Sequence, residues 1–525
     1  MAEHESARPD PAGVLTDRPP EIEVRAPADG GVVGRVPNLT AEQVAGLVRR
    51  ARAAQAEWAA RSPRDRARLL HRFRRRLADR ADEAAALSSR ESGKLLYEAL
   101  IGDVLPCLDL ARFYARRVGR VMRAESVRSW MITKKGRVER EPFGVVGIIS
   151  PWNFPVVNPM RAVLAALVTG NTVVLKPSEM SPLSMLLIRE IASEAGIPED
   201  VFLVATGDGG TGRALVEADI DKISFTGSVS TGRSVAEAAA RRLLPVVLEL
   251  AGKNAMVVLA DADLARAVNL AAMGAYWNAG QICIAVERVY VEAAIYDEFL
   301  DRVVRETESL VVANRSEPDA DIGALTTQAQ VERLERQLRD ARSKGARVLT
   351  GGRALEGPGR HFAPTVVADV DHSMAIMREE SFGPVMPIMK VADAEEAIRL
   401  ANDSPYALAA SIWTRRRRGE RMVRRLRAGM VSVNDVLFHG AMAGLPFGGM
   451  GDSGYGRVHG EEGLREMTQT RAVLVDRTGA ARETVGGYPF RRFGTARARA
   501  LIRLLHGRGV GGRLHGLRGI VRNRD

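Results

Sequence analysis

Cysteines and long apolar runs are scarce in this sequence of 525 residues. Only two cysteines occur, Cys107 and Cys283, and no stretch of about 18 apolar residues is present. A disulfide framework is therefore excluded, a reducing compartment is favoured, and no membrane-spanning helix is expected. Residues 1–13 hold three acids and no apolar run, so we expect no secretory leader and predict a cytoplasmic protein.

Acidic residues are almost absent from the C-terminal end. Residues 491–525 contain ten arginines and one acid, and so carry +9 of the formal net charge of +12. The remaining chain is nearly balanced, and we expect no nucleic-acid partner. Apolar residues at 498, 501, 502, 504 and 505 fall on one side of a predicted helix, with Arg499, Arg503 and His506 on the other. This basic amphipathic helix fits peripheral contact with an anionic membrane surface, and it also fits packing on a neighbouring subunit.

Periodicity and helix signals organise the rest of the chain. Residues 1–20 hold four prolines and predict a disordered arm. Thr40 and Gln43 predict a capping box, and Ser62-Pro63 predicts the start of a second helix. Short apolar strands alternate with helices over residues 145–250, and a second series follows over 255–433. We therefore predict two α/β domains with doubly wound parallel sheets. Residues 120–140 alternate charged and apolar side chains, which predicts a hairpin that leaves the main body.

Two side chains are candidates for covalent chemistry. Cys283 ends the segment Gly-Gln-Ile-Cys between a predicted helix at 262–277 and a predicted strand at 287–292. A loop thiol suits a nucleophile, although a buried structural thiol is commoner, and we interpret Cys107 as such a core residue. Glu249 ends the apolar strand 245–250, where α/β proteins bind ligands. Partial burial there is expected to raise its pKa toward that of a general base, and a solvated strand end is the alternative.

The expected cofactor segments depart from the usual dinucleotide fingerprint. No Gly-x-Gly-x-x-Gly follows a strand, but Gly227 and Ser228 lie where a strand runs into a helix. The N–H groups and dipole of such a helix start favour a pyrophosphate, although an ordinary capped helix looks the same. Glu179, after Lys176 at the end of another strand, is suited to accept hydrogen bonds from ribose hydroxyls. Asn153, between two prolines, is suited to donate to a developing oxyanion.

Together these segments resemble the NAD(P)-dependent aldehyde dehydrogenase superfamily over about residues 22–476. The matching motifs occur in the family's order: Pro-Trp-Asn-Phe-Pro (151–155), Lys-Pro-Ser-Glu (176–179), Phe-Thr-Gly-Ser (225–228), Glu-Leu-Ala-Gly-Lys (249–253), Gly-Gln-Ile-Cys (280–283), Glu-Ser-Phe-Gly-Pro (380–384) and Pro-Phe-Gly-Gly (446–449). The implied architecture is a disordered arm (1–20), a cofactor-binding domain (21–118 and 143–251), a catalytic domain (252–451), an oligomerisation element (119–142 and 465–478) and a basic tail (479–525).

The resemblance implies oxidation of an aldehyde to an acid by NAD⁺, with NADP⁺ as an alternative and no metal. Cys283 would attack the aldehyde, Asn153 and the backbone N–H of Cys283 would hold the oxyanion, and Glu249 would activate water against the thioester. Glu380 would bind the nicotinamide ribose with Phe382 beside the ring, and we assign Trp152 to the same site. A homodimer or homotetramer is implied. A CoA-acylating semialdehyde dehydrogenase and a non-catalytic membrane-bound scaffold are the alternatives, and Glu249 and Cys283 argue against them.

The sequence also departs from the family and leaves the substrate open. Ala251 replaces the usual Gly after the Glu-Leu pair, and Gly451 stands where many members carry Lys. Arg161 falls where succinate-semialdehyde dehydrogenases carry a carboxylate-binding Arg, and an ion pair between elements is the alternative. Four aromatic residues are candidates to line an apolar substrate tunnel, or to be ordinary core. They are Phe154, Trp277, Phe438 and Phe447.

Overall fold

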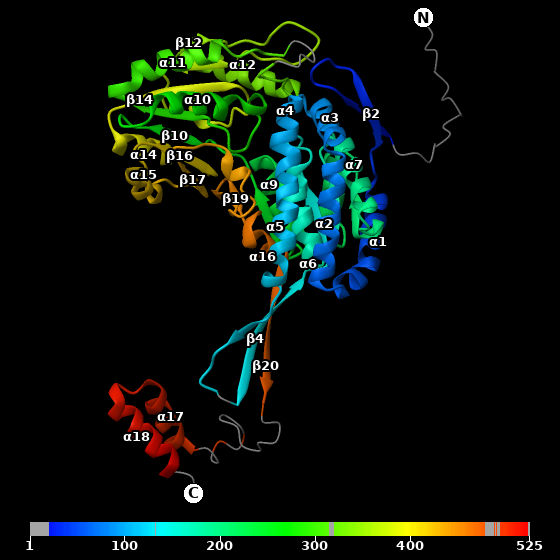
Figure 1. The fold of residues 1–525 in the computed structure, drawn as a ribbon, viewed down its shortest axis with the longest axis vertical. Coiled ribbons are helices and arrows are strands. Elements are labelled where there is room, and N and C mark those ends of the chain that lie inside the picture. Colours follow the sequence, from blue (N-terminus) through cyan, green and yellow to red (C-terminus); the bar gives the residue numbers. More distant parts are fainter. Residues whose placement is uncertain are drawn as a thin grey trace, which may run out of the picture. The chain divides into compact units, whose positions relative to one another are not determined.

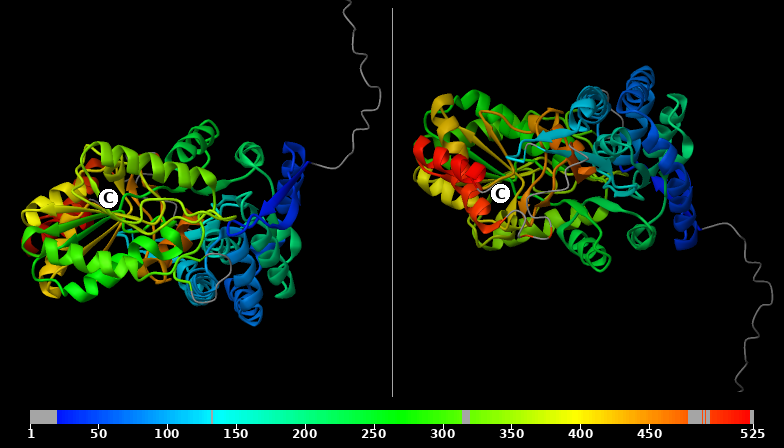
Figure 2. Two further views of the ribbon diagram at one scale, coloured as in Figure 1. Left: turned by 90° about the horizontal axis from the view of Figure 1, so that it is seen from above. Right: turned by 90° about the horizontal axis from the view of Figure 1, so that it is seen from below.

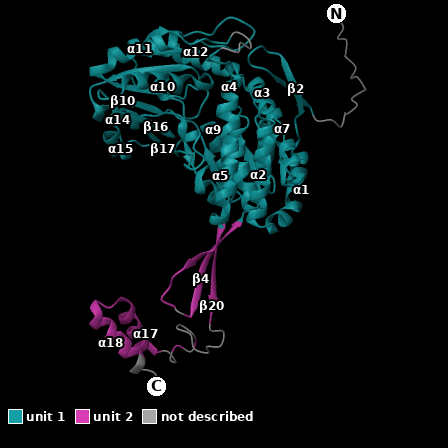
Figure 3. Cartoon of the chain, viewed as in Figure 1, with its two compact units in different colours: residues 1–121, 142–469 teal, residues 122–141, 470–525 magenta. Residues whose placement is uncertain are grey.

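A computed structural model describes residues 20–131, 133–313, 320–477, 488, 490 and 494–522, without the side chains of residues 521 and 522. The chain divides into two compact units, coloured separately in Figure 3. Unit 1 comprises residues 1–121 and 142–469, and unit 2 comprises residues 122–141 and 470–525. The predicted arm over 1–20 lies outside the described residues except for its last position, as does most of the segment 479–493.

The first sheet of unit 1 has six strands in the order β19-β9-β8-β5-β6-β7. Strands β5 to β9 are parallel, and the order turns outward in both directions from β5, so the sheet has a switch point between β5 and β8. The edge strand β19 is antiparallel to β9. The strands are β5 (Val145–Ile149), β6 (Thr172–Lys176), β7 (Phe202–Val204), β8 (Lys222–Thr226), β9 (Val246–Glu249) and β19 (Gly454–Tyr455).

Helices connect and cover these strands (Figure 1). The predicted capping box is present, since Thr40 and Gln43 each bond the other's backbone N–H. Trp58 is buried and donates from Nε1 to the carbonyl of Leu167 at 3.0 Å, which docks α1 on α6. The helices are α1 (Ala41–Ala60), α2 (Pro63–Asp79), α3 (Ala81–Ser92), α4 (Leu96–Ala99), the π-helical turn η1 (Leu100–Val104), α5 (Leu105–Val121), α6 (Val157–Thr169), α7 (Pro182–Glu194), the 3₁₀ turn η2 (Glu199–Val201), α8 (Gly209–Glu217), α9 (Val229–Ala240) and α16 (Gly460–Glu466).

The second sheet has seven strands in the order β12-β13-β14-β11-β10-β16-β17. Six are parallel, and β12 at one edge is antiparallel to β13. Helices lie on both sides of this sheet in the views of Figure 2. Its strands are β10 (Ala255–Val258), β11 (Arg288–Glu292), β12 (Arg347–Thr350), β13 (Thr365–Ala368), β14 (Val385–Val391), β16 (Ala409–Trp413) and β17 (Met430–Val433). The prediction of two doubly wound sheets is confirmed, with an antiparallel edge strand added to each.

The remaining elements of unit 1 are helices of the second half and short pairs of strands. The pair β1–β2 and the pair β15–β18 are antiparallel. The elements are β1 (Glu21–Arg25), β2 (Val32–Pro37), α10 (Leu264–Tyr276), η3 (Trp277–Gly280), η4 (Ala293–Ile295), α11 (Tyr296–Glu308), α12 (Gln328–Ser343), α13 (Ala375–Arg378), α14 (Ala394–Asn402), β15 (Tyr406–Ala407), α15 (Arg416–Met422), η5 (Val423–Arg425), η6 (Phe438–Gly440) and β18 (Met450–Gly451).

Unit 2 contains a three-stranded sheet and two helices. The sheet order is β20-β4-β3, and β3 pairs antiparallel with β4, as expected for a hairpin. The elements are β3 (Glu125–Val127), β4 (Lys134–Pro142), β20 (Thr468–Asp476), α17 (Gly494–His506) and α18 (Gly509–Arg522). The predicted basic tail therefore forms two helices rather than one. Among the helices of the described segments, none combines the length and the apolar character needed to cross a membrane.

Candidate active site

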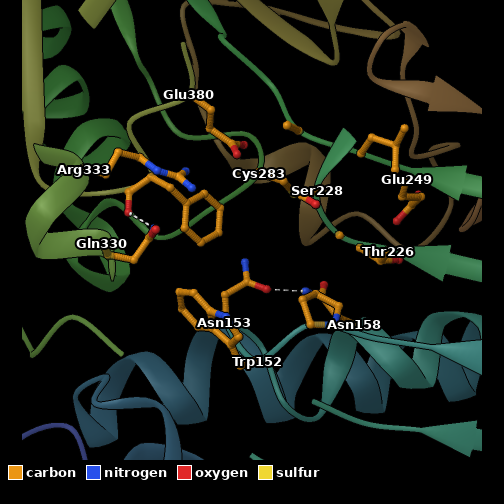
Figure 4. A pocket seen from close by; sticks show the side chains of 15 residues that line it. Trp152, Asn153, Asn158, Thr226, Ser228, Glu249, Cys283, Gln330, Arg333 and Glu380 are labelled. Carbon is orange, nitrogen blue, oxygen red and sulfur yellow. Dashed lines mark hydrogen bonds between the residues drawn. The ribbon is translucent and has the colours of Figure 1, made fainter. Parts of the chain in front are cut away.

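One pocket, of about 190 Å³, lies where the carboxyl ends of β5, β8 and β9 approach the segment before β11. Side chains from these elements, from α12 and from the segment before β14 point into it (Figure 4). Asn153, Glu249 and Cys283 all line it, although 130 positions separate the first from the last. The pocket therefore lies at the carboxyl ends of the strands beside the switch point of the first sheet.

Asn153 is held by hydrogen bonds to its backbone and its side chain. Its carbonyl accepts from Lys94 Nζ at 2.8 Å and from Asn278 Nδ2 at 3.0 Å. Its Nδ2 donates to the carbonyl of Gln281 at 3.0 Å, and its Oδ1 accepts from Asn158 Nδ2 at 3.0 Å, drawn dashed in Figure 4. All of these groups are buried. The amide nitrogen is thus directed toward the segment that carries Cys283, with one of its two N–H groups used.

Asp103, in the π-helical turn η1, fixes the start of α6, the helix that follows Asn153. Its Oδ1 accepts from the N–H groups of Val156 and Val157 at 3.1 and 2.6 Å, and its Oδ2 accepts from Ser88 Oγ at 2.7 Å. Its Oδ2 also lies 3.6 Å from Lys94 Nζ, and neither side chain is exposed. One buried ion pair therefore supports both sides of the segment that presents Asn153.

The segment before Cys283 has an irregular backbone locked by polar contacts. Asn278 and Ala279 adopt φ of +55° and +51°, a conformation that costs side-chain-bearing residues about 1–2 kcal/mol each. A Cβ on Gly280 would lie 2.2 Å from the carbonyl oxygen of Gly383, so only glycine fits. Gln281 is fully buried and accepts at Oε1 from the Thr326 N–H at 2.8 Å. These contacts hold the thiol in a fixed place.

Burial raises the pKa values of the two groups expected to exchange protons in this pocket. Protein packed around the Cys283 thiol raises its pKa to about 12, against a lowering by the Arg161 charge. Burial of Glu249 raises its pKa to about 7, again opposed by Arg161 and then by Arg457. Glu249 Oε2 lies 4.0 Å from Arg161 Nη1. The thiol is therefore protonated at rest near neutral pH, and Glu249 titrates in that range.

A buried pair opposite the thiol holds the segment with Glu380 and Phe382. The carboxylate of Glu287 accepts from the N–H groups of Ser381 and Phe382, both at 2.9 Å, and from Lys253 Nζ at 2.7 Å. Phe382 has φ of +53° and meets the ring of Trp152 edge-on at 5.5 Å between centroids. Glu380 Oε1 accepts from the Gly252 N–H at 3.1 Å, and burial raises its pKa.

The predicted cofactor residues divide between the pocket and its surroundings. Trp152, Gly227, Ser228, Glu380 and Phe382 line the pocket, and Ser228 caps α9 by accepting from the Thr231 N–H at 3.3 Å. A Cβ on Gly227 would lie 2.7 Å from the ring of Phe225, so a larger residue there would require that ring to shift. The open N-terminus of α9 fits the pyrophosphate of NAD(P)⁺. Lys176 and Glu179 pair with each other at 3.1 Å outside this lining.

The predicted substrate residues are not in the lining around Cys283. Arg161 is buried, stacks on the ring of Phe447 at 4.3 Å, and has no hydrogen-bond partner for Nε and Nη1 within the described chain. Phe154 and Trp277 both pack at Gly102 of η1, where an added Cβ would lie 3.3 Å from each. Phe438 is half exposed in η6.

The structure explains the departure at Gly451, and nothing in it explains Ala251 in place of glycine. Ala251 lines the pocket, and its carbonyl accepts from Ser453 Oγ at 2.7 Å. Gly451 has φ of +59°, and a Cβ there would lie 2.9 Å from Arg427 Nη2. A lysine at position 451 would thus be strained and would face a guanidinium.

Three residues that line the pocket lie outside the motifs recognised in the sequence, namely Asn158, Gln330 and Arg333. Gln330 Nε2 donates to the carbonyl of Phe382 at 3.0 Å. The only sequence feature that could place Gln330 and Arg333 at the pocket is their i, i+3 spacing on one helix. Polar residues on any solvated helix face show the same spacing. Lys94 and Asp103 were missed for the same reason, because nothing near them in sequence marks what they bind.

Comparisons with known proteins show which family the chain resembles along most of its length. The profile of the aldehyde dehydrogenase family matches residues 15–473. The chain is 37% identical over 487 residues to a 4,4'-diapolycopene aldehyde oxidase of Methylomonas sp., covering 92% of this chain and 91% of the relative. It is 38% identical over 448 residues to a putative succinate-semialdehyde dehydrogenase [NADP(+)] of Mycolicibacterium smegmatis, covering 84% and 86%. The structure of a Mycobacterium tuberculosis aldehyde dehydrogenase complexed with NAD+ is similar with a TM-score of 0.85 and 36% identity, covering 90% and 96%.

We expect Asp103→Asn to destabilise the protein and lower its activity. The change keeps the side-chain shape but removes the charge that neutralises buried Lys94, which typically costs about 3–5 kcal/mol. Urea unfolding followed by circular dichroism measures the loss. Asp109→Asn, at an exposed position of α5, is the matched control and should change stability by less than about 0.5 kcal/mol. Equal effects of the two substitutions would contradict a supporting role for Asp103.

Proposed function

Because the chain belongs to the aldehyde dehydrogenase family and oxidises aldehydes with NAD(P)⁺, we propose that Cys283 is its nucleophile, Glu249 its general base and Asn153 its oxyanion donor. The observation that carries this assignment is that all three line the single pocket described above. The pKa of Glu249, raised to about 7, suits proton transfer near neutrality.

The thiol first loses its proton, and its sulfur then forms a bond to the aldehyde carbon. Since burial raises the pKa of Cys283 to about 12, a base is needed. Two carboxylates line the pocket, and we assign Glu249 to this step because Glu380 already accepts from the Gly252 N–H. The carbonyl oxygen gains the negative charge and accepts from the second N–H of Asn153 Nδ2 and the backbone N–H of Cys283. Such a donor typically lowers the barrier by about 3–4 kcal/mol.

The thiohemiacetal then becomes a thioester, which water cleaves. When bound, the nicotinamide cofactor supplies the acceptor for the hydride that leaves the carbon. Glu249 first releases the proton of the thiol to solvent. It then removes a proton from water, the water oxygen adds to the thioester carbon, and the sulfur leaves with the bonding pair and takes that proton back from Glu249. The product is a carboxylic acid. Glu249 in the pocket favours water over coenzyme A as the acceptor of the acyl group, which argues against the CoA-acylating alternative.

Several residues are proposed to hold the cofactor. The N-terminus of α9 with Gly227 and Ser228 would bind the pyrophosphate, and Glu380 would bind the nicotinamide ribose with Phe382 and Trp152 beside the ring. Glu179, oriented by Lys176, would accept hydrogen bonds from the adenosine ribose and would repel a 2′-phosphate. This favours NAD⁺ over NADP⁺.

The sheet of unit 2 is proposed to join subunits in a homodimer or homotetramer. Apolar side chains are exposed on β3, on β20 and in the loop between β3 and β4. A group of exposed apolar side chains on so small a sheet is typical of a protein interface. They are Val127, Trp130, Leu474 and Val475.

We propose an aldehyde with an apolar body as the substrate. The stretch α4–η1–α5 exposes apolar side chains, and the segment 437–445 exposes several more. Tyr97 lies 6.0 Å from Trp277 between ring centroids, which joins this apolar surface to the predicted aromatic residues. The exposed side chains are Leu96, Tyr97, Ile101, Leu105, Phe438, Met442 and Leu445.

A small acidic semialdehyde is the second candidate. The observation in its favour is the buried guanidinium of Arg161, with two nitrogens lacking hydrogen-bond partners among the described residues. Against it, Arg161 already faces the Glu249 carboxylate at 4.0 Å and stacks on Phe447. A substrate carboxylate would have to compete with both.

Cys283→Ala should abolish aldehyde oxidation, because no other thiol lines the pocket. Cys107→Ala is the control, since Cys107 is fully buried in α5 and is expected to affect stability only. Mass spectrometry of enzyme quenched during turnover should show an acyl adduct on wild type and on the Cys107 variant. Retained turnover in the Cys283 variant would exclude it as the nucleophile.

Glu249→Gln should slow aldehyde oxidation by about 10²–10⁴, because the Glu249 carboxylate takes the proton both from the thiol and from the attacking water. In wild type the steady-state rate should fall about tenfold per pH unit below about 7, because a protonated Glu249 cannot accept a proton. Rapid mixing at several pH values measures both effects. The exposed Glu237→Gln variant is the control. An unchanged pH profile in Glu249→Gln would contradict the assignment.

An aldehyde panel separates the two substrate classes. We expect kcat/KM for hexanal and benzaldehyde to exceed that for succinate semialdehyde by at least about tenfold. Burying a few methylene groups of the substrate in an apolar pocket changes kcat/KM by that factor. Arg161→Met should leave KM for hexanal within about threefold of wild type. A preference for succinate semialdehyde that Arg161→Met removes would decide for the acidic substrate.

A further inference from the structure

The last two helices form a hairpin that lies beyond the family match at residues 15–473. We call α17 and α18, residues 494–522, the helical hairpin. A Cβ on Gly516 would lie 2.3 Å from the backbone nitrogen of Leu504, and one on Gly519 would lie 2.8 Å from the Cβ of Ala500. As the residue number increases along α17, the number of the residue that it contacts in α18 decreases. The helices are antiparallel and touch at backbone distance.

Helical geometry then fixes which side chains share a face. Each residue turns the helix by about 100°, and in an antiparallel pair the positions that follow the contact residues fall on one side of both helices. In α17, Leu501 and Leu505 follow the contact residues Ala500 and Leu504. In α18, Leu517 follows Gly516 and Ile520 follows Gly519. The hairpin consequently has one apolar face, formed by Leu501, Leu505, Leu517 and Ile520, and Ile502 and Leu514 extend it onto the outer side of each helix.

The residues that precede the contact residues form the face of the hairpin opposite the apolar face. Arg499 precedes Ala500, Arg503 precedes Leu504, and Arg518 precedes Gly519. Arg513 follows Gly512 and so lies on the same side as the apolar face, at the end near the turn, and Arg508 lies in the turn between the helices. Residues 494–522 contain seven arginines and no Asp or Glu. The hairpin is thus a strongly cationic amphipathic element.

The apolar face is open to solvent in the described part of unit 2. Ile502 is 61% exposed, Leu514 50% and Leu517 48%, as is Val510 at the start of α18 with 75%. The glycines that allow the close contact leave no room for these side chains between the helices, so the hairpin has almost no core of its own. An exposed apolar surface of this kind on a small element marks an interaction site.

We propose that the helical hairpin binds an anionic lipid bilayer, with its apolar face at the boundary between headgroups and acyl chains. The guanidinium groups beside that face bind lipid phosphates, for which their paired N–H donors are suited. A second copy of the hairpin is disfavoured as the partner, because seven arginines would meet seven more with no acid to neutralise them. A nucleic acid would leave the leucines in water.

Vesicle sedimentation of the full-length protein tests this. We expect binding to vesicles of phosphatidylcholine mixed with phosphatidylglycerol, and at least about tenfold weaker binding to phosphatidylcholine alone. Raising the salt from about 0.05 M to about 0.5 M should release part of the bound protein, because the Debye length falls below the length of an arginine side chain. No binding to the anionic vesicles would overturn the proposal.

The variant Leu514→Ser/Leu517→Ser should bind these vesicles at least about tenfold more weakly, because it lacks two apolar side chains that would be buried in the bilayer. Both side chains are half exposed, so folding should survive. Val32→Ser/Val311→Ser changes two equally exposed apolar residues of unit 1 and is the matched control, expected to bind as wild type does. Equal binding of both variants would overturn the proposal, as would a change in oligomeric state by light scattering without any lipid binding. Aldehyde oxidation in solution should be unchanged in both variants, so this test and that of the proposed chemistry fail independently.

Discussion

The buried backbone carbonyl of Asn153 is the acceptor on which the geometry of the active site depends. Lys94, between α3 and α4, and Asn278, in η3, both donate to it. An ammonium buried at Lys94 is tolerated only because Asp103 lies 3.6 Å away, and Asp103 also caps the helix after Asn153. One ionic contact therefore links the N-terminal helices, the turn after β5 and the segment before Cys283. A pocket assembled from distant segments needs such a link to keep its groups in register.

Exclusion of water has the same effect on every acid in the pocket. Burial raises the pKa values of Cys283, Glu249 and Glu380 alike, and the charge of Arg161 opposes it for the first two. For Glu249 the result is a carboxyl that can both hold and release a proton near neutral pH. For Cys283 it is a thiol that needs a base close by. The two consequences are complementary, which is the physical basis for assigning them to one reaction.

Much of the fold and the chemistry followed from local patterns. The capping box at Thr40, the parallel strands that lead to Glu249, the doubly wound class and the aldehyde dehydrogenase activity were predicted and are confirmed. The roles of individual residues stay proposals, supported by the meeting of Asn153, Glu249 and Cys283 in one pocket. The tail was predicted as one amphipathic helix. It forms two, because the glycines of α18, which weaken a lone helix, allow close packing against α17.

The sequence by itself determined the chemical types at the site and the elements that carry them, since motifs and periodicity are local properties. Tertiary structure decided what those side chains face. Arg161 lies against Glu249 and Phe447. Lys253 and Glu287 hold the segment with Phe382. The spacing of these residues along the chain does not predict either set of contacts. Which buried charges are neutralised, and which face of a helix stays uncovered, depends on residues brought together from far apart in the sequence. That is the reason these features required coordinates.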